Sequence, residues 1–253
     1  MPHLKRHFAP KTWKIKRKGI KFITKPSPGT HKINMSLPIN VILRDILDYA
    51  DSNREVKFML EKRDVVVNGT RTRDYKFPVG LFDVLSLKDI NEHFRVILDV
   101  RGNISLIKVK DNEKELKLCK ITGKSMVKGK VQLSLYDGKN IVVQENSYKV
   151  GDSILLVLAK KCQIKGHIGL EKGILIYLTG GGHIGQTGKV QDIRGDRILY
   201  KTETGDVVET LKKYAFPIGK DKPLLTLTNQ DEFDETNKCR KSYSKHWGWN
   251  RPS

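Results

Sequence analysis

The sequence predicts an α+β fold that is mostly β. Apolar residues recur at helical spacing only between residues 37 and 62. From residue 64 to 211, short alternating or β-branched runs are separated by glycine turns, a pattern typical of small β-barrels and sandwiches. A basic stretch interrupted by prolines precedes the helical and the β regions. We expect an arm (1–36), an α/β module (37–94), a central β-barrel-like module (95–172), a small barrel (173–222) and a tail (223–253).

The net charge of the chain indicates which classes of molecule the protein binds. The 253 residues include 48 Lys and Arg against 28 Asp and Glu, a formal net charge of +20. Such an excess points to nucleic acid or an anionic membrane surface. No apolar run reaches the roughly 18 residues that a membrane helix needs, so we expect a cytoplasmic protein with no membrane partner. The three cysteines are far apart and lack Cys-x-x-Cys spacing, so we expect neither a metal site nor a disulfide.

The N-terminal arm concentrates the charge. Residues 1–44 hold eleven Lys and Arg and no acid, interleaved with aromatic and aliphatic residues. Prolines interrupt any helix, and the arm has too little apolar surface to fold alone. We expect an extended arm whose cations neutralise RNA phosphates and whose aromatics stack on bases. A localisation signal or a solvated tail is the alternative. The candidate RNA-binding residues are His3, Lys5, Arg6, His7, Lys11, Trp13, Lys14, Lys16, Arg17, Lys18, Lys21, Lys25, His31 and Lys32.

The α/β module has a distinctive order of elements. A helix is expected over residues 38–50, and a second from Arg54 to about Lys62 with Ser52 or Asn53 as its cap. A β-branched strand, an Asn-Gly turn and a strand over residues 83–87 follow. This order resembles the alpha-L motif, the RNA-binding fold first named for bacterial ribosomal protein four. An ordinary solvated face is the alternative. The resemblance implicates Arg44, Arg54, Lys57, Lys62, Arg63, Asn68, Arg71 and Arg73 in RNA binding.

The central module is predicted to be a scaffold. Turn signals such as Asp137-Gly138 separate the expected strands, and acidic, histidine and cysteine residues do not cluster. We therefore expect no catalytic chemistry in this module. The expected strands span residues 95–100, 104–109, 116–121, 131–135, 141–143 and 153–158.

The C-terminal module carries a glycine-rich run from Gly180 to Gly188. A dinucleotide-binding G-x-G-x-x-G motif is rejected because a strand follows it, where that motif opens a helix. A P-loop is rejected because its spacing is one residue too long and Val190 replaces the required Ser or Thr. Flanking strands at 173–179, 189–193, 197–200 and 206–211 make the run resemble the KOW motif of an SH3-like barrel. That resemblance implicates His183, Gln186 and Lys189 in RNA binding; a purely structural glycine loop is the alternative.

The order of these modules, together with several local motifs, resembles the archaeal and eukaryotic e-type family of small-subunit ribosomal protein four. The matching motifs include His3-Leu-Lys-Arg6, Gly29-Thr-His-Lys32, Phe82-Asp-Val-Leu-Ser86 and Lys117-Leu-Cys-Lys120. An acidic stretch and a Trp-rich end replace the basic extension of eukaryotic members, which favours an archaeal-type source. The resemblance implies a structural constituent of the small ribosomal subunit that binds the 5′ domain of its ribosomal RNA and contacts neighbouring ribosomal proteins.

Two other functions are compatible with the same modules. One is a KOW-containing transcription or translation factor. The other is an RNA-modifying enzyme, such as a pseudouridine synthase, that uses an alpha-L domain to bind RNA. Such an enzyme needs a large catalytic domain, for which the β modules leave no room. We therefore expect no enzymatic activity, no cofactor and no small-molecule substrate.

Overall fold

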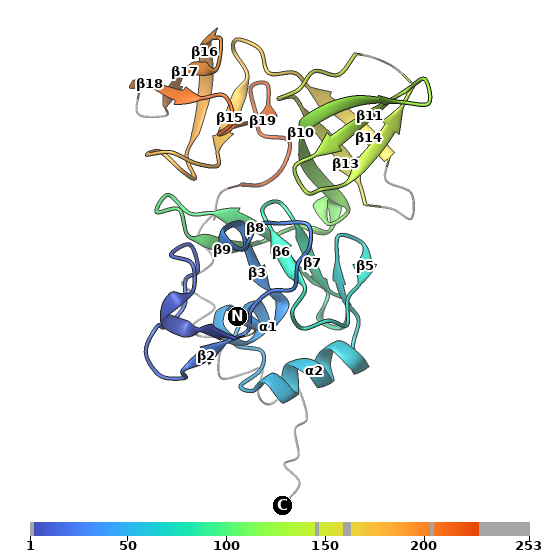
Figure 1. Ribbon diagram of the computed structural model, residues 1–253, viewed down its shortest axis with the longest axis vertical. Coiled ribbons are helices and arrows are strands. Elements are labelled where there is room, and N and C mark those ends of the chain that lie inside the picture. Colours follow the sequence, from blue (N-terminus) through green and yellow to red (C-terminus); the bar gives the residue numbers. More distant parts are fainter. Residues whose placement is uncertain (1–2, 145–146, 159–162, 203–204, 228–253) are drawn as a thin grey trace, which may run out of the picture.

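The computed structural model describes residues 3–144, 147–158, 163–202 and 205–227. A lower body contains the arm together with the helices and strands up to β9 (Ile104–Lys108). Two β units lie above this body (Figure 1). Neighbouring strands in the sheets pair antiparallel. The predicted α+β, mostly β class is confirmed. Most of the expected tail, residues 228–253, lies outside the described residues.

The N-terminal arm is folded onto the body, so the prediction of an extended arm is wrong. Strand β1 (Leu4–Lys5) pairs with β2 (Phe22–Ile23), and the 3-10 turn η1 (Arg6–Phe8) follows β1. Trp13 is only 2% exposed and forms a bridge with Ile104 of the body. The arm lacks enough apolar surface to fold alone, but it buries Ala9, Trp13 and Ile23 against the core of the body.

The first predicted helix is much shorter than expected. After η2 (Ile33–Met35) and β3 (Ser36–Pro38), one turn of α1 (Ile39–Val41) widens into the π-helical turn η3 (Ile42–Ile46). The Leu47 N–H bonds to the carbonyl of Ile42, five residues back, at 2.9 Å. Asp48 then adopts a φ of 54°, which ends the helical path. Spacing of apolar residues could not distinguish this irregular turn from a continuous helix.

The second helix is confirmed as α2 (Asn53–Lys62). The Ser52 hydroxyl accepts from the Glu55 N–H at 3.3 Å, while the Glu55 carboxylate accepts from the Asp51 N–H at 2.8 Å. This reciprocal pair is a close variant of the capping box, which satisfies N–H groups at a helix start. Val56, Met59 and Leu60 point into the core.

The first five-stranded sheet has the order β5-β4-β7-β8-β9. Asn68 and Gly69, with φ of 50° and 79°, form the predicted turn between β4 and β5. The sheet continues past the expected module boundary between residues 94 and 95, which falls inside β8. Its strands are β4 (Val65–Val67), β5 (Thr70–Arg71), β7 (Val84–Leu87), β8 (Glu92–Leu98) and β9 (Ile104–Lys108); β6 (Pro78–Gly80) pairs separately with β3, and η4 (Lys88–Ile90) joins β7 to β8.

The two upper units are five-stranded sheets with the orders β12-β11-β10-β13-β14 and β18-β17-β16-β15-β19. The two units contact each other where β19 (Ala215–Gly219) lies against three strands of the central unit. These strands are β10 (Leu116–Val127), β13 (Ser153–Val157) and β14 (Gln163–Ile168). The expected strands are all present, and β14 and β19 are additional. The elements are η5 (Asp111–Glu113), β10 (Leu116–Val127), β11 (Lys130–Leu135), β12 (Asn140–Val143), β13 (Ser153–Val157), β14 (Gln163–Ile168), β15 (Leu175–Leu178), β16 (Thr187–Arg194), β17 (Arg197–Thr202), β18 (Val207–Leu211) and β19 (Ala215–Gly219).

The glycine-rich loop between β15 and β16 packs against the first sheet. Gly185 has a φ of 79°, and a Cβ at this position would lie 2.3 Å from the Asp99 carbonyl oxygen in the β8–β9 turn. A Cβ on Gly102 in that turn would lie 3.0 Å from Ile184 of the loop. The close approach that the glycines allow is therefore made to the protein's own backbone.

This packing predicts that Gly185→Ala is strongly destabilising. Backbone strain alone should lower the free energy of unfolding by about 1–3 kcal/mol, and the Cβ must also displace the Asp99 carbonyl. The control is Gly182→Ala, whose Cβ would meet no atom within 4 Å. It should stay within about 0.5 kcal/mol of wild type in urea unfolding. Equal midpoints for the two variants would show that the loop does not pack tightly.

Candidate nucleic-acid interface

Most of the predicted RNA-binding residues lie on the surface. In the arm, the lysines alternate with residues that turn inward, so that Lys14 and Lys16 are exposed on either side of the half-buried Ile15. Flexible ammonium groups in such positions can follow phosphates. The exposed candidates are His3, Lys5, His7, Lys11, Lys14, Lys16, Arg17, Lys18, Lys21, Lys25, Lys32, Arg54, Lys57, Lys62, Arg71, Arg73, His183 and Lys189.

Two arginines among the candidates, Arg6 and Arg17, hold the arm in place, and Arg44 binds the carboxylate that Arg6 also uses. Buried Arg6 forms an ion pair with Asp45 of η3, and Arg44 pairs with the same carboxylate at 2.7 Å. Arg17 donates to the Ala9 carbonyl at 2.7 Å and so closes a loop within the arm. Because the guanidinium groups of Arg6 and Arg17 already bind protein oxygens, they position the arm, and its lysines are the groups that reach outward.

The structure corrects the assignment of Trp13 and His31 as direct RNA contacts. The indole N–H of Trp13 donates to the Ile33 carbonyl at 3.3 Å, and its ring lies in the core. The His31 side chain is 1% exposed and bonds to Asp83 at 3.0 Å. Both side chains are enclosed by protein, as is that of Arg6, and cannot stack on a base or reach a phosphate from this position. An aromatic residue in a basic segment does not reveal from sequence alone which side it faces.

Helix α2 exposes a basic face next to the arm. Arg54, Lys57 and Lys62 point away from the buried apolar side, and the Lys57 ammonium lies 4.8 Å from the centre of the Tyr75 ring. The helix is tied to the arm by Asn40 of α1, whose amide donates to the Thr24 hydroxyl and to the Asn53 carboxamide at 2.6 and 2.8 Å. The two basic segments therefore keep a fixed relation to each other.

Two further candidates of this module already have acidic neighbours. Arg63 pairs with Asp89 at 3.3 Å and Arg71 with Asp64 at 3.1 Å. All four side chains are more than a third exposed, and such pairs contribute little to stability. A phosphate could replace either carboxylate at low cost.

The glycine-loop candidates have a mixed environment. His183 Nδ1 lies 3.1 Å from the Gln186 side-chain oxygen, and Lys189 pairs with exposed Asp221 at 3.1 Å. A Cβ on Gly180 would collide with the Tyr214 ring at 2.5 Å. Gly180 and Gly185 are thus explained by internal packing, while His183 and Lys189 remain accessible.

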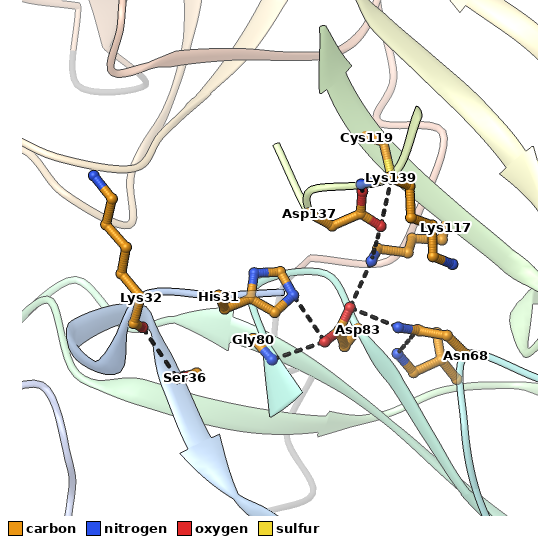
Figure 2. Close-up of polar contacts among 11 residues, drawn as sticks. His31, Lys32, Ser36, Asn68, Gly80, Asp83, Lys117, Cys119, Asp137 and Lys139 are labelled. Carbon is orange, nitrogen blue, oxygen red and sulfur yellow. Dashed lines mark hydrogen bonds and ion pairs between the residues drawn. The ribbon is translucent and has the colours of Figure 1, made fainter. Parts of the chain in front are cut away.

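A buried ionic cluster, which sequence reasoning missed, joins the arm, the first sheet and the central module (Figure 2). Lys117 of β10 lies 2.6 Å from Asp83 and 2.8 Å from Asp137. Asp83 also accepts from the Gly80 N–H at 2.8 Å and from Asn68 at 2.8 Å, in addition to its bond with His31. Asn68, which the sequence predicted to contact RNA, therefore belongs to this cluster. The only signal of this cluster in the sequence is that lysines stand among the apolar residues at the start of β10.

Asp83 and Lys117 strongly favour their charged forms within this cluster. Burial by itself would raise the pKa of Asp83, but the Lys117 ammonium and the His31 bond outweigh it and hold that pKa well below its usual range. Burial would lower the pKa of Lys117, yet the carboxylates beside it raise it above its usual range. Burial raises the pKa of the Cys119 thiol to about 12. Asp83 and Lys117 therefore keep their charged forms near neutrality, and Cys119 offers no reactive thiolate.

Further buried polar groups connect the three sheets. The Tyr177 hydroxyl of β15 accepts from the Leu98 N–H at 3.0 Å and donates to the Leu98 carbonyl at 2.7 Å. The Lys120 ammonium of β10 donates to three carbonyls in the segment before and within β19, those of Lys212, Lys213 and Ala215. The sheets thus share directional bonds as well as apolar contacts.

Within the described ranges, no helix is long and apolar enough to cross a membrane. The same residues contain no group of three or more His, Cys, Asp or Glu side chains that could hold a metal ion.

A basic, lysine-rich surface covers a scaffold in which the buried Arg6, Arg95 and Lys117 lie beside carboxylates, the charge distribution expected of a protein that binds a polyanion. Residues 90–163 match the model of ribosomal family S4e, and residues 2–34 match the RS4NT (NUC023) domain. The chain therefore belongs to the S4e family of ribosomal proteins, and it is not an enzyme.

The relatives are archaeal and similar along nearly their whole length. The chain is 42% identical over 239 residues to the small ribosomal subunit protein eS4 of Methanococcus aeolicus, covering 89% of this chain and 97% of that protein. Identity and coverage are the same for eS4 of Methanocaldococcus jannaschii. The crystal structure of the 30S ribosomal protein S4e from Thermoplasma acidophilum superposes with a TM-score of 0.65 at 30% identity, over 77% of this chain and 99% of that one. The resemblance seen in the sequence is confirmed.

The cluster predicts that Lys117→Met severely destabilises the protein. Removing the cation leaves the carboxylates of Asp83 and Asp137 buried without a positive charge between them, which should cost about 3–5 kcal/mol. The matched control is Lys130→Met on β11, an exposed site of similar chain length, which should change stability by less than about 0.5 kcal/mol. Thermal and urea unfolding of both variants would measure the difference. A Lys117→Met protein as stable as the control would mean that the cluster is not an important support.

A second prediction concerns acid stability. Because the pKa of Asp83 is depressed on folding, the unfolded chain takes up the proton first as pH falls below about 4, and the free energy of unfolding then decreases. Asp83→Asn should be less stable at neutral pH and should lose stability less steeply between about pH 4 and pH 2. Asp221→Asn, at a carboxylate that is 85% exposed, serves as the control and should retain the steep loss. Identical slopes for all three proteins would contradict the assignment.

Proposed function

We propose that this protein is a structural constituent of the small ribosomal subunit that binds and stabilises its ribosomal RNA during translation in the cytoplasm. The observation that carries the proposal is the family relation, which extends over 97% of the length of relatives named as small-subunit proteins. The same relation removes the support for a transcription factor or an RNA-modifying enzyme. We also propose the 5′ domain of that RNA as the site, with neighbouring ribosomal proteins as further partners.

We infer that the modules correspond to known RNA-binding folds. For an alpha-L domain, expected over 37–94, the support is α2, the strand β4, and the Asn68-Gly69 turn. Since the sheet runs on through β9, we extend this module to about residue 109. For a KOW barrel over 173–222, the support is the antiparallel sheet β15–β19 with its glycine loop after the first strand. The central β module then lies between them and ends near residue 172.

In this proposal, the exposed lysines of the arm and of α2 neutralise RNA phosphates. Neutralising a phosphate releases condensed counterions, so that affinity decreases as salt increases. The paired arginines beneath the arm keep its lysines in position, which reduces the ordering cost of binding. Deleting the whole arm would not test this function, because Ala9, Trp13 and Ile23 belong to the core.

The test is a quadruple substitution of Lys14, Lys16, Lys18 and Lys21 to Gln. Each lysine–phosphate ion pair that is removed should flatten the slope of log affinity against log salt by about 0.7–0.9, so binding to small-subunit RNA should weaken most at low salt. The control carries Gln at four exposed lysines outside the arm, Lys110, Lys128, Lys130 and Lys165. Filter binding at several salt concentrations compares the two. If the arm variant keeps the wild-type slope while the control loses it, the arm is not the anchor.

A further inference from the structure

The arm presents aromatic rings to solvent as well as lysines. We propose that Phe22 forms a stacking platform for unpaired bases of RNA and that Phe8 offers a second exposed ring on the same arm. This inference rests on the proposed RNA-binding function and specifies which part of the RNA the arm recognises.

The β1–β2 ribbon determines the orientation of Phe22. Adjacent side chains on a strand point to opposite faces. Ile23 is 6% exposed and packs in the core, whereas Phe22 is 48% exposed. Across the ribbon, Leu4 pairs with Ile23 and exposed Lys5 pairs with Phe22. The ribbon therefore has an apolar inner face and an outer face on which a ring and a cation stand together.

Cationic and aromatic groups surround the outer ring. The Lys21 ammonium lies 5.5 Å from the centre of the Phe22 ring, and the His3 ring centre lies 5.8 Å from it. Phe8, one turn beyond β1, is 68% exposed and lies 4.2 Å from the His7 ring. Trp13, the aromatic residue most prominent in the sequence, is inside the core, so Phe8 and Phe22 are the large aromatic rings that the arm exposes.

The surroundings select an RNA partner with unpaired bases. Residues 1–44 contain no acid, so the surface around the rings suits a polyanion. Unpaired nucleotides combine phosphates for the lysines with flat faces for the rings. A duplex offers the same phosphates but keeps its bases stacked inside. The occupant we assign is therefore a loop, bulge or single-stranded segment of RNA.

The experiment uses the full-length protein and two probes, oligoadenylate and an RNA duplex with the same number of phosphates. Phe22→Leu keeps an apolar side chain without a π face, and should lower affinity for oligoadenylate about tenfold with an unchanged salt slope. Its affinity for the duplex should stay within about twofold of wild type. Phe22→Tyr retains the ring and should bind both probes like wild type. Fluorescence anisotropy at several salt concentrations measures all of these.

Ile20→Ala provides the matched control for simple apolar contact. Ile20 is 63% exposed on the same arm but has no ring, so its removal should leave binding of oligoadenylate nearly unchanged. Equal losses for Ile20→Ala and Phe22→Leu, or no loss for Phe22→Leu, would overturn the stacking inference. The proposed function would still stand if the four-lysine variant lost affinity and salt slope in the same assay. Unfolding midpoints equal to wild type show that the variants are folded.

Discussion

The structure depends most on one buried cation, the Lys117 ammonium, between the carboxylates of Asp83 and Asp137. A charge removed from water is costly unless it is paired and hydrogen-bonded, so each member of this cluster requires the others in place. Lys117 and Asp137 come from the central module, Asp83 follows β6 of the body, and His31 belongs to the arm (Figure 2). A single set of short polar contacts therefore fixes three segments that are distant in sequence.

This fixed junction divides the charges of the protein into two groups with different roles. Inside, each buried cation has a specific partner: Arg6 pairs with Asp45, Arg95 with Glu113, and Lys120 with three carbonyls. Outside, the arm and α2 present lysines on a surface that is already shaped. A partner that binds a preformed surface has little ordering to impose, which favours stable assembly. The net charge of +20 is thus compatible with folding because its excess lies at the surface.

Local patterns in the sequence predicted local structure well. The N-terminal cap of α2 at Ser52, the Asn68-Gly69 turn and the strands from β7 to β18, except β14, follow from short-range chemistry. The family resemblance supplied the function. Features set by distant contacts could not be predicted. The segment 38–50 has helical spacing, but tertiary contacts widen it into a π turn. Trp13 was expected to face RNA and instead fills the core, and Lys117 gave no sign that it would be buried against carboxylates of other strands. A strand pattern shows that side chains alternate, but it does not show which sheet will cover them.

The most direct test of the proposed interface is a high-resolution density map of a small ribosomal subunit that contains this chain. We expect the ammonium groups of Lys14, Lys16, Lys18 and Lys21 within ion-pair distance of ribosomal RNA phosphates, with Trp13 still in the core and Lys117 still between its two carboxylates. A map in which the arm faces solvent, or in which Trp13 leaves the core to contact RNA, would contradict the interface proposed here.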